Sequence, residues 1–129
     1  MTYEYNGIEI NINFEKEESE KHIENDFQVL VNTGVDNIIK EKFIPWLLGE
    51  DFIDKDKEKV FEGIKVYDIT YYYGRVIAKY SPTGEDNFFG QFEFSFESCS
   101  DYTSDILETV CMEVYVLDGK IVKVSGYDI

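Results

Sequence analysis

The side chains of this 129-residue chain that could do chemistry begin with its one histidine, His22. Glu18 and Asp26 lie four residues to either side, so a helix would place all three side chains on one face. One imidazole with two carboxylates on a solvated helix face is nevertheless a poor metal site. We interpret His22 as an exposed helix residue in an acidic neighbourhood, and we expect neither a metal ion nor a cofactor.

Other catalytic signatures are missing from the sequence, which holds no nucleophile elbow, phosphate-binding loop, dinucleotide fingerprint or Cys-x-x-Cys pair. The stretch from Asp54 begins like a calcium loop, but Lys59 and Lys65 occupy the positions that need glycine and glutamate. In so acidic a chain, a catalytic pair of carboxylates like that of a glycosidase stays an alternative. Glu93 and Glu97 do not suit that role, because four residues along one strand separate them by about 13 Å. We expect no enzyme, and a carboxylate-based hydrolase is the least favoured alternative.

The charge balance is the strongest global feature, with a formal net charge of −15 from 27 acidic and 12 basic residues. It argues against binding nucleic acid or an anionic membrane through a basic surface. The segment from Ser81 to Gly119 contains no lysine or arginine. It contains nine acids, which are Glu85, Asp86, Glu93, Glu97, Asp101, Asp105, Glu108, Glu113 and Asp118. This charge serves either solubility or a basic partner, whose association would then depend on salt.

Length and composition predict a single domain over residues 1–129, because 43% hydrophobic and 16% aromatic residues suffice to fill a core. No apolar run approaches the roughly 18 residues of a membrane span, and the first ten residues lack the pattern of a signal peptide. We therefore expect a cytoplasmic protein. Cys99 and Cys111 should be reduced, half-buried thiols.

The stretch Val110–Val124 predicts a β-hairpin that turns at Asp118-Gly119. A two-residue loop would set apolar side chains opposite charged ones, such as Val114 opposite Lys123. A three-residue loop, which adds Leu117, sets apolar side chains opposite apolar ones, and we choose it for that reason. It predicts an apolar face and a cross-strand ion pair, with Met112, Val114, Val116, Val122 and Val124 on the face and Glu113 with Lys123 in the pair.

Three earlier stretches also predict strands. Tyr3–Phe14 predicts a short hairpin with a turn at Asn6-Gly7, and Ile64–Tyr80 predicts a tyrosine-rich strand region with a turn or bulge at Gly74-Arg75. Phe89–Ser98 alternates most clearly. Its phenylalanines should face the core and its polar residues water, with Phe92, Phe94 and Phe96 on one side and Gln91, Glu93, Ser95 and Glu97 on the other.

The helical signals lie between the first two of these stretches. Glu15–Asn32 predicts a helix with Asn13 as a plausible N-cap and an apolar stripe of Ile23, Phe27, Leu30 and Val31. Gly34 either breaks the helical region or only weakens it, and the period resumes over Val35–Leu48. Pro45 either ends that helix or begins a short third piece. Asp54 can cap a last short helix that stops at Gly63.

Together these elements predict an α+β fold with a mainly antiparallel sheet of five to seven strands and two or three helices packed on one face. The closing stretch DGKIVKVSGYDI (118–129) and the strand FGQFEFSF (89–96) resemble the C-terminal half of small acidic bacterial domains of unassigned function. That group includes candidate immunity proteins of polymorphic toxins. The resemblance covers the last third of the chain and implies a bacterial protein that works by binding another protein.

The sequence hypothesis is therefore a binding domain whose acidic sheet face meets a basic protein. Tyr72 must face opposite to its neighbours Tyr71 and Tyr73 on a strand, and tyrosine is enriched at interfaces. The candidate partner-binding residues are Glu93, Glu97, Asp101, Asp105 and Tyr72. The alternative is a structural or accessory domain that forms a homodimer through an exposed strand edge, with no charged partner.

Overall fold

The computed structural model describes residues 4–12, 16–50, 56–100, 103 and 110–128. Its strands are β1 (Glu4–Tyr5), β2 (Ile8–Ile12), β3 (Ile64–Val76), β4 (Asn87–Ser98), β5 (Val110–Leu117) and β6 (Lys120–Asp128). Its helices are α1 (Lys16–Thr33), α2 (Val35–Ile38), the π-helical η1 (Ile39–Phe43), α3 (Ile44–Glu50) and α4 (Lys57–Glu62). The α+β class and the helix-bearing architecture that the sequence predicts are confirmed.

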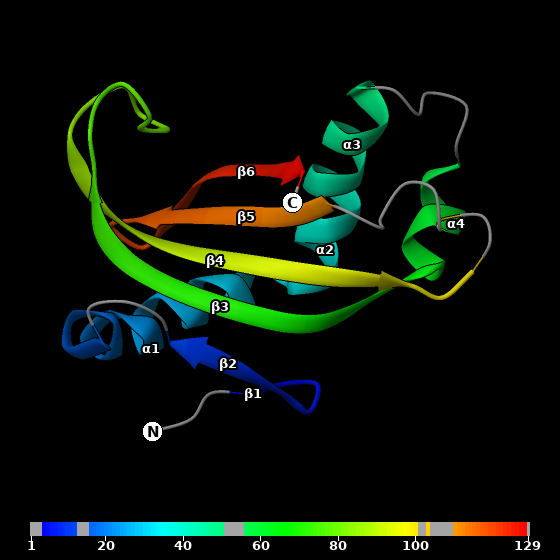
Figure 1. Cartoon of the computed structure of the whole chain (residues 1–129), viewed down its shortest axis with the longest axis horizontal. Helices are drawn as coiled ribbons and strands as arrows, with labels where there is room; N and C mark the ends of the chain where they lie inside the picture. The colour runs from blue at the N-terminus through cyan, green and yellow to red at the C-terminus, as the bar shows by residue number, and fades with distance from the viewer. Residues whose placement is uncertain (1–3, 13–15, 51–55, 101–102, 104–109, 129) are drawn as a thin grey trace.

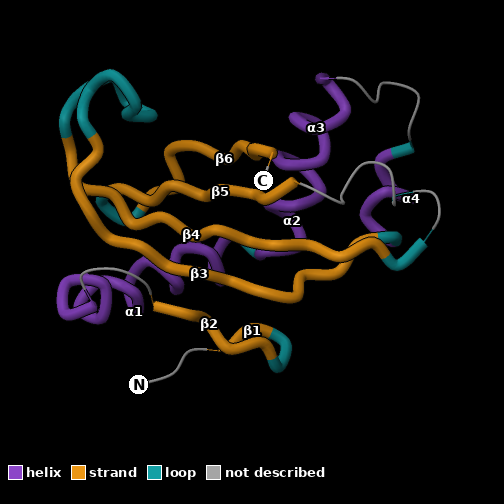
Figure 2. Tube along the Cα trace, viewed as in Figure 1, coloured by secondary structure: helices purple, strands orange, loops and turns teal. Residues whose placement is uncertain are grey.

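The six described strands form one sheet in sequence order, from β1 to β6 (Figure 1). All neighbours are antiparallel except β2 and β3, which run parallel. A parallel pair needs a long crossover, and the helical segment between β2 and β3 provides it. The long strands β3 and β4 form the middle of the sheet and bend together at their shared turn, as the tube in Figure 2 also shows.

The helices cover one face of the sheet (Figure 1). Phe43 of η1 stacks on Phe96 of β4 with ring centroids 5.3 Å apart, and Phe27 of α1 lies 6.1 Å from the ring of Phe92. Phe92, Phe94 and Phe96 are all buried, so the predicted core face of this strand is confirmed. In the predicted stripe of α1, Ile23 and Leu30 are fully buried, but Val31 is 51% exposed and does not belong to the core.

Gly34 breaks the first helical region, which settles the choice that the sequence leaves open. Its φ of +90° lies outside the helical range, and it separates α1 from α2. From α2 the chain runs through η1 into α3, and Ile44 keeps helical angles (φ −62°, ψ −43°) although Pro45 follows it. The wide π turn before Pro45 gives the proline ring room against the preceding carbonyl groups. Pro45 therefore lies in the first turn of α3.

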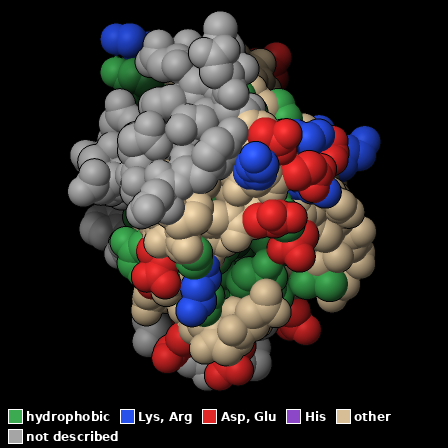
Figure 3. Space-filling view, turned by 90° about the vertical axis from the view of Figure 1, so that its right-hand side faces the viewer, with side chains coloured by type: hydrophobic (Ala, Val, Ile, Leu, Met, Phe, Trp, Pro, Cys, Tyr) green, Lys and Arg blue, Asp and Glu red, His purple; other side chains and the backbone are tan. Residues whose placement is uncertain are grey.

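The cap of α4 is Asp56, whose side chain accepts a hydrogen bond from the backbone N–H of Lys59 at 3.2 Å. The predicted cap, Asp54, lies outside the described residues, whereas the predicted stop at Gly63 is confirmed. Ion pairs join α4 to η1 and its surroundings, at 2.8 Å for Lys40 with Glu58. Acidic and basic side chains intermingle over this end of the molecule (Figure 3).

The N-terminal hairpin follows its prediction, but the C-terminal one does not. Tyr5 pairs with Ile8 across a turn in which Asn6 and Gly7 both have positive φ. The C-terminal turn contains only Asp118 and Gly119, also at positive φ, so the three-residue loop is wrong.

A bulge in β6 corrects the pairing that led us to reject the two-residue loop. Tyr115 pairs with Lys123 and Val116 with Ile121, so Val122 is an extra residue on β6. Beyond the bulge Val114 meets Val124, as apolar matching requires. Val122 itself is 37% exposed and leaves the predicted apolar face. The predicted ion pair of Glu113 with Lys123 is absent from the strand register.

Strand β3 ends earlier than the sequence predicts. It passes through Gly74-Arg75 without a turn and stops at Val76, and residues 78–80 form a turn rather than strand. The real irregularity of β3 is a bulge at Tyr67, between Val66 and Asp68. No helix in the described part of the chain is both long and apolar enough to cross a membrane.

Candidate functional site

The face of the sheet opposite the helices carries the best-developed group of polar side chains. Gln91, Glu93 and Ser95 of β4 point to this open face, as their alternation with buried phenylalanines predicts. They are half-buried rather than solvated, and Phe89 on the same face is only 2% exposed. The open face is therefore a partly enclosed surface, not the simple wet face that the sequence indicates.

Two glutamates stand directly opposite each other on this face. Glu93 of β4 is the register partner of Glu113 of β5, and directly opposed residues have Cβ atoms about 4.5–5.5 Å apart. The Tyr72 hydroxyl donates to Glu93 Oε2 at 2.9 Å, and Gln91 Nε2 donates to Glu113 Oε1 at 3.0 Å. Neither carboxylate forms an ion pair with a described residue. Strands β3, β4 and β5 thus bring two acids and two neutral donors together.

Burial and like charge shift the titration of this group. Burial raises the pKa of Glu113, and the neighbouring charge of Glu93 raises it further, against the opposing effects of Lys123 and the hydrogen bond from Gln91. Burial also raises the pKa of the Tyr115 hydroxyl, with the charges of Glu113 and Glu93 acting in the same direction. The negative charge on this face is therefore poorly compensated by the protein itself.

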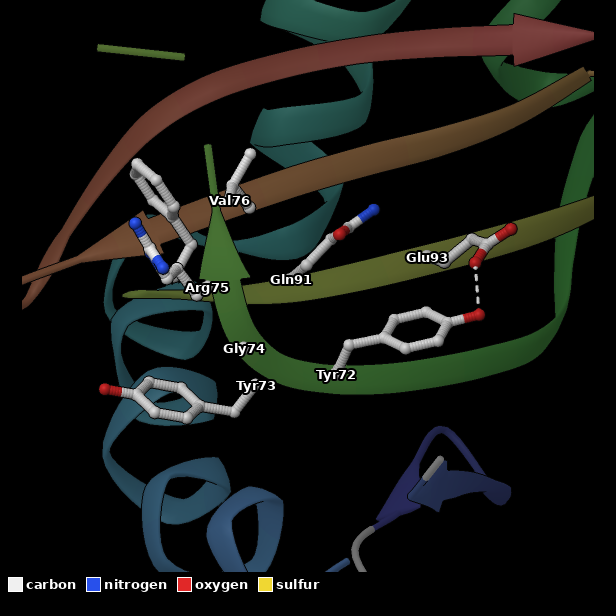
Figure 4. A pocket seen from close by; sticks show the side chains of 8 residues that line it. Tyr72, Tyr73, Gly74, Arg75, Val76, Gln91 and Glu93 are labelled. Atoms are coloured by element: carbon white, nitrogen blue, oxygen red, sulfur yellow. Dashed lines mark hydrogen bonds between the residues drawn. The ribbon is translucent and has the colours of Figure 1, made fainter. Parts of the chain in front are cut away.

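A cavity of about 490 Å³ adjoins this group where β3 and β4 bend. Its lining consists of Tyr72, Tyr73, Gly74, Arg75, Val76, Phe89, Gln91 and Glu93. Figure 4 shows Tyr72 and Glu93 joined by their hydrogen bond on one side of β3, with Tyr73 pointing to the other side. The cavity combines aromatic and aliphatic walls with one carboxylate, which is the usual make-up of a ligand site.

Of the predicted site residues that the structure describes, two lie in contact and one lies apart. Tyr72 and Glu93 touch each other, whereas Glu97 is exposed and carries no described hydrogen bond, four residues further along β4. Asp101 and Asp105 lie outside the described residues. Sequence reasoning missed Glu113, because the wrong hairpin register assigned it to Lys123. The signal that was available is the strict alternation of β4 and β5, which puts both glutamates on the same face.

A second polar group lies between α1 and β3 and has a packing role. Tyr71 is fully buried, and its hydroxyl donates to Asp26 Oδ2. His22 stacks on Tyr73 with ring centroids 3.7 Å apart and an interplanar angle of 12°. His22 is thus half-buried against the sheet rather than an exposed helix residue. Among the described residues, no three His, Cys, Asp or Glu side chains are placed to share a metal ion.

Asp26 should make stability fall as pH rises. Burial raises the pKa of its carboxyl, although the Tyr71 hydrogen bond and the His22 charge lower it. The folded state therefore holds this proton more tightly than the unfolded chain, so the stabilisation is present below the ordinary pKa of about 3.9 and is lost through the raised pKa. We expect Asp26→Asn to remove this dependence and to be at least as stable as wild type at pH 7.

Urea unfolding of wild type and Asp26→Asn from pH 3 to pH 8 measures this effect as the difference between their free energies of unfolding at each pH. Asp26→Ala is the control, because it leaves the buried Tyr71 hydroxyl without its acceptor and should destabilise by about 1–3 kcal/mol at every pH. Parallel stability curves for wild type and Asp26→Asn would show that Asp26 does not titrate in this way.

A second cavity, of about 590 Å³, lies at the other end of the sheet between the β1–β2 turn and α4. Hydrophobic side chains show in a recess on that end of the molecule (Figure 3). Two of the polar residues that line it are already joined, since the Tyr5 hydroxyl donates to Asp36 Oδ1 at 3.2 Å. Burial and the Asp36 charge raise the pKa of Tyr5 to about 12. We therefore place the candidate site on the open face.

The cysteines contribute no described disulfide. Cys99 is exposed and Cys111 is buried on the open face, with its sulfur 3.4 Å from the Ser95 hydroxyl. Burial raises the pKa of the Cys111 thiol, so it is a poor nucleophile. Comparison with known proteins finds no matching family model, no similar curated protein and no similar solved structure.

Proposed function

We propose that this protein is a binding domain that receives a basic segment of another protein on the open face of its sheet. One observation carries the proposal: Glu93 and Glu113 face each other half-buried beside an aromatic cavity, without a described ion pair. A cytoplasmic toxin neutralised by this chain, acting as an immunity protein, would be one such partner.

The energetics of the open face favour a cation from outside. Two carboxylates that face each other across a strand pair repel, and burial strengthens this repulsion. The raised pKa of Glu113 is a consequence of both effects. A basic group that binds between them removes the repulsion, so part of the cost of holding the pair is recovered on binding. The net charge of −15 would also steer a basic partner toward the protein.

The same charge disfavours the homodimer alternative at this surface. Two copies brought face to face would oppose two poorly compensated glutamate pairs and two net charges of −15. The edge of β6 stays available to a dimer.

Hydrolysis by the two carboxylates has less support than binding. A two-carboxylate mechanism needs the acids on opposite sides of the bond that breaks. Glu93 lines the cavity, whereas Glu113 does not. A substrate in this cavity would therefore contact one acid of the pair, and the geometry favours recognition over cleavage.

Selection of a phage-displayed random peptide library on the wild-type protein tests the proposal. We expect the selected peptides to be enriched in lysine and arginine and to bind at least tenfold more weakly at 0.5 M than at 0.05 M salt, because exposed charge interactions are screened. Glu93→Gln/Glu113→Gln should weaken these peptides at least tenfold.

The matched control is Glu17→Gln/Glu24→Gln, which removes the same charge from two exposed positions on α1, across the sheet from the site. It should change affinity less than threefold. Peptides without a basic surplus, or equal weakening by both double variants, would refute a basic partner on the open face.

A further inference from the structure

We propose that the cavity at the bend of β3 and β4 is a receptacle for a guanidinium group, supplied by an arginine side chain of the partner. This inference rests on the proposed function, to which it adds the chemical group that is recognised. It follows from the shape of the cavity, its open hydrogen-bond acceptor and the state of its one cation.

The shape of the cavity depends on a missing side chain. Gly74 of β3 is the register partner of Phe89 of β4, so this cross-strand pair has a side chain on one strand only. A Cβ built on Gly74 would have no atom within 4 Å, and its φ is not in the positive range. The space beside Phe89 is thus open because residue 74 is a glycine, although the backbone at this position would also accept a residue with a side chain. Its volume of about 490 Å³ holds one long side chain with accompanying water.

The open acceptor of the cavity lies on Glu93, and a second one lies on Glu113, its register partner outside the cavity lining. Tyr72 binds Oε2 of Glu93 and Gln91 binds Oε1 of Glu113, and the second oxygen of each carboxylate accepts no hydrogen bond from a described residue. A planar guanidinium offers five N–H donors in a fixed fork, so it can pair with the Glu93 carboxylate that lines the cavity. An ammonium group is a compact, strongly hydrated charge that suits this arrangement less well.

The walls of the cavity match the flat faces of a guanidinium. Tyr72 supplies a half-buried aromatic ring, and Phe89 lines the cavity with a ring that is only 2% exposed and is held by an edge-on contact with Tyr115 at 5.9 Å between centroids. Arginine stacks on aromatic faces and lays its aliphatic stem along apolar surface. Val76, which also lines the cavity, provides such surface.

The cation that already lines the cavity is engaged elsewhere. The Arg75 guanidinium pairs with Asp86, which also accepts from the backbone N–H of Ala78 at 2.7 Å. These donors, the Ala78 N–H above all, lower the pKa of Asp86, so the carboxylate stays charged and keeps Arg75 occupied. Arg75 is therefore not the partner of Glu93, and no other described residue forms an ion pair with that carboxylate, so we infer a cation from outside the chain.

Titration with N-acetyl-arginine amide, followed by two-dimensional ¹⁵N NMR, tests the inference. We expect saturable shifts that are largest at the backbone amides of Tyr72, Gly74 and Gln91. N-acetyl-citrulline amide has the same shape without the charge and should bind at least tenfold more weakly. N-acetyl-lysine amide should bind at least threefold more weakly than the arginine compound.

Two variants separate the cavity from the charge. Gly74→Leu fills the cavity with a side chain that the backbone accepts, and Glu93→Gln removes the carboxylate that lines it; each should weaken the arginine compound at least fivefold. Glu17→Gln, far from the site, should leave its affinity unchanged. Equal binding of the citrulline compound, or full binding by Gly74→Leu, would overturn the guanidinium site.

The outcomes distinguish this inference from the proposed function. If basic peptides bind the open face but are indifferent to Gly74→Leu, the binding function stands and the guanidinium site is wrong. If the arginine compound binds in the cavity but no basic peptide is selected, the site stands as one for a free guanidino compound, and the protein partner is wrong.

Discussion

Gly90→Ala should destabilise the protein by about 2–4 kcal/mol, although it adds a single methyl group to a strand. A Cβ at this position would lie 2.8 Å from Cγ of Asp26 and 2.9 Å from the Tyr71 hydroxyl, and it would overlap Asp26 Oδ2. Overpacking alone costs about 1–3 kcal/mol. Asp26 could relieve the overlap only by turning away from Tyr71, whose buried hydroxyl would then lose its acceptor at a cost of about 1–3 kcal/mol.

Gly74→Ala is the matched control for this prediction. Gly74 lies on the neighbouring strand and one residue away in the register, and its added Cβ would meet nothing within 4 Å. It should be neutral or stabilise by up to about 1 kcal/mol, because alanine lowers the entropy of the unfolded chain. Urea unfolding of both variants, with the midpoint and the slope fitted, measures the difference.

A double-mutant cycle with Asp26→Ala tests the cause. If the clash with Asp26 is responsible, Gly90→Ala should cost at least about 1.5 kcal/mol less in the Asp26→Ala background than in wild type. Equal costs in both backgrounds would contradict the explanation and place the strain in the strand itself.

Local patterns predicted the elements of this fold well. The alternation of Phe89–Ser98 placed its phenylalanines in the core, and two Asx-Gly pairs, Asn6-Gly7 and Asp118-Gly119, marked both tight turns. Each of these signals depends on residues next to one another in the sequence. The helical period likewise placed α1, although the sequence left open whether Gly34 breaks the helical region.

What failed depends on residues far apart or on an irregularity. The register of the last hairpin was wrong because a bulge at Val122, which no local pattern marks, restores apolar matching after a two-residue turn. The parallel pairing of β2 with β3 requires knowing where the helical segment returns the chain. The limits of β3 were misplaced because Ala78 and Tyr80 continue the strand pattern within a turn.

The candidate site was half predicted for the same reason. Tyr72 and Glu93 were assigned to the outer face from alternation alone. Their contact with each other and the opposition of Glu93 to Glu113 follow from the registers of β3 with β4 and β4 with β5. The cavity depends in addition on Gly74, which sequence reasoning interpreted as a turn or a bulge. A glycine inside a strand can also mark a place where a ligand or another backbone approaches closely.

Phe43→Ala should destabilise the protein by about 3–5 kcal/mol, the range for a buried phenylalanine. Phe43 ends the π-helical segment and is fully buried. Its ring stacks on Phe96 at 5.3 Å and on Trp46 at 6.2 Å between centroids, and a Cβ on Gly126 of β6 would come within 2.9 Å of its edge. One ring therefore joins the helical layer to two separate strands of the sheet.

Phe88→Ala provides the comparison, because it removes the same atoms from a ring that is 52% exposed on the β4 side of the bend and should cost less than about 1.5 kcal/mol. Urea unfolding followed by tryptophan fluorescence suits both variants, since Trp46 contacts Phe43 directly. A cost for Phe43→Ala no greater than that for Phe88→Ala would mean that η1 does not anchor the helices to the sheet. The open face would then lose its rigid support, because the helices behind β4 hold the strand that presents Glu93.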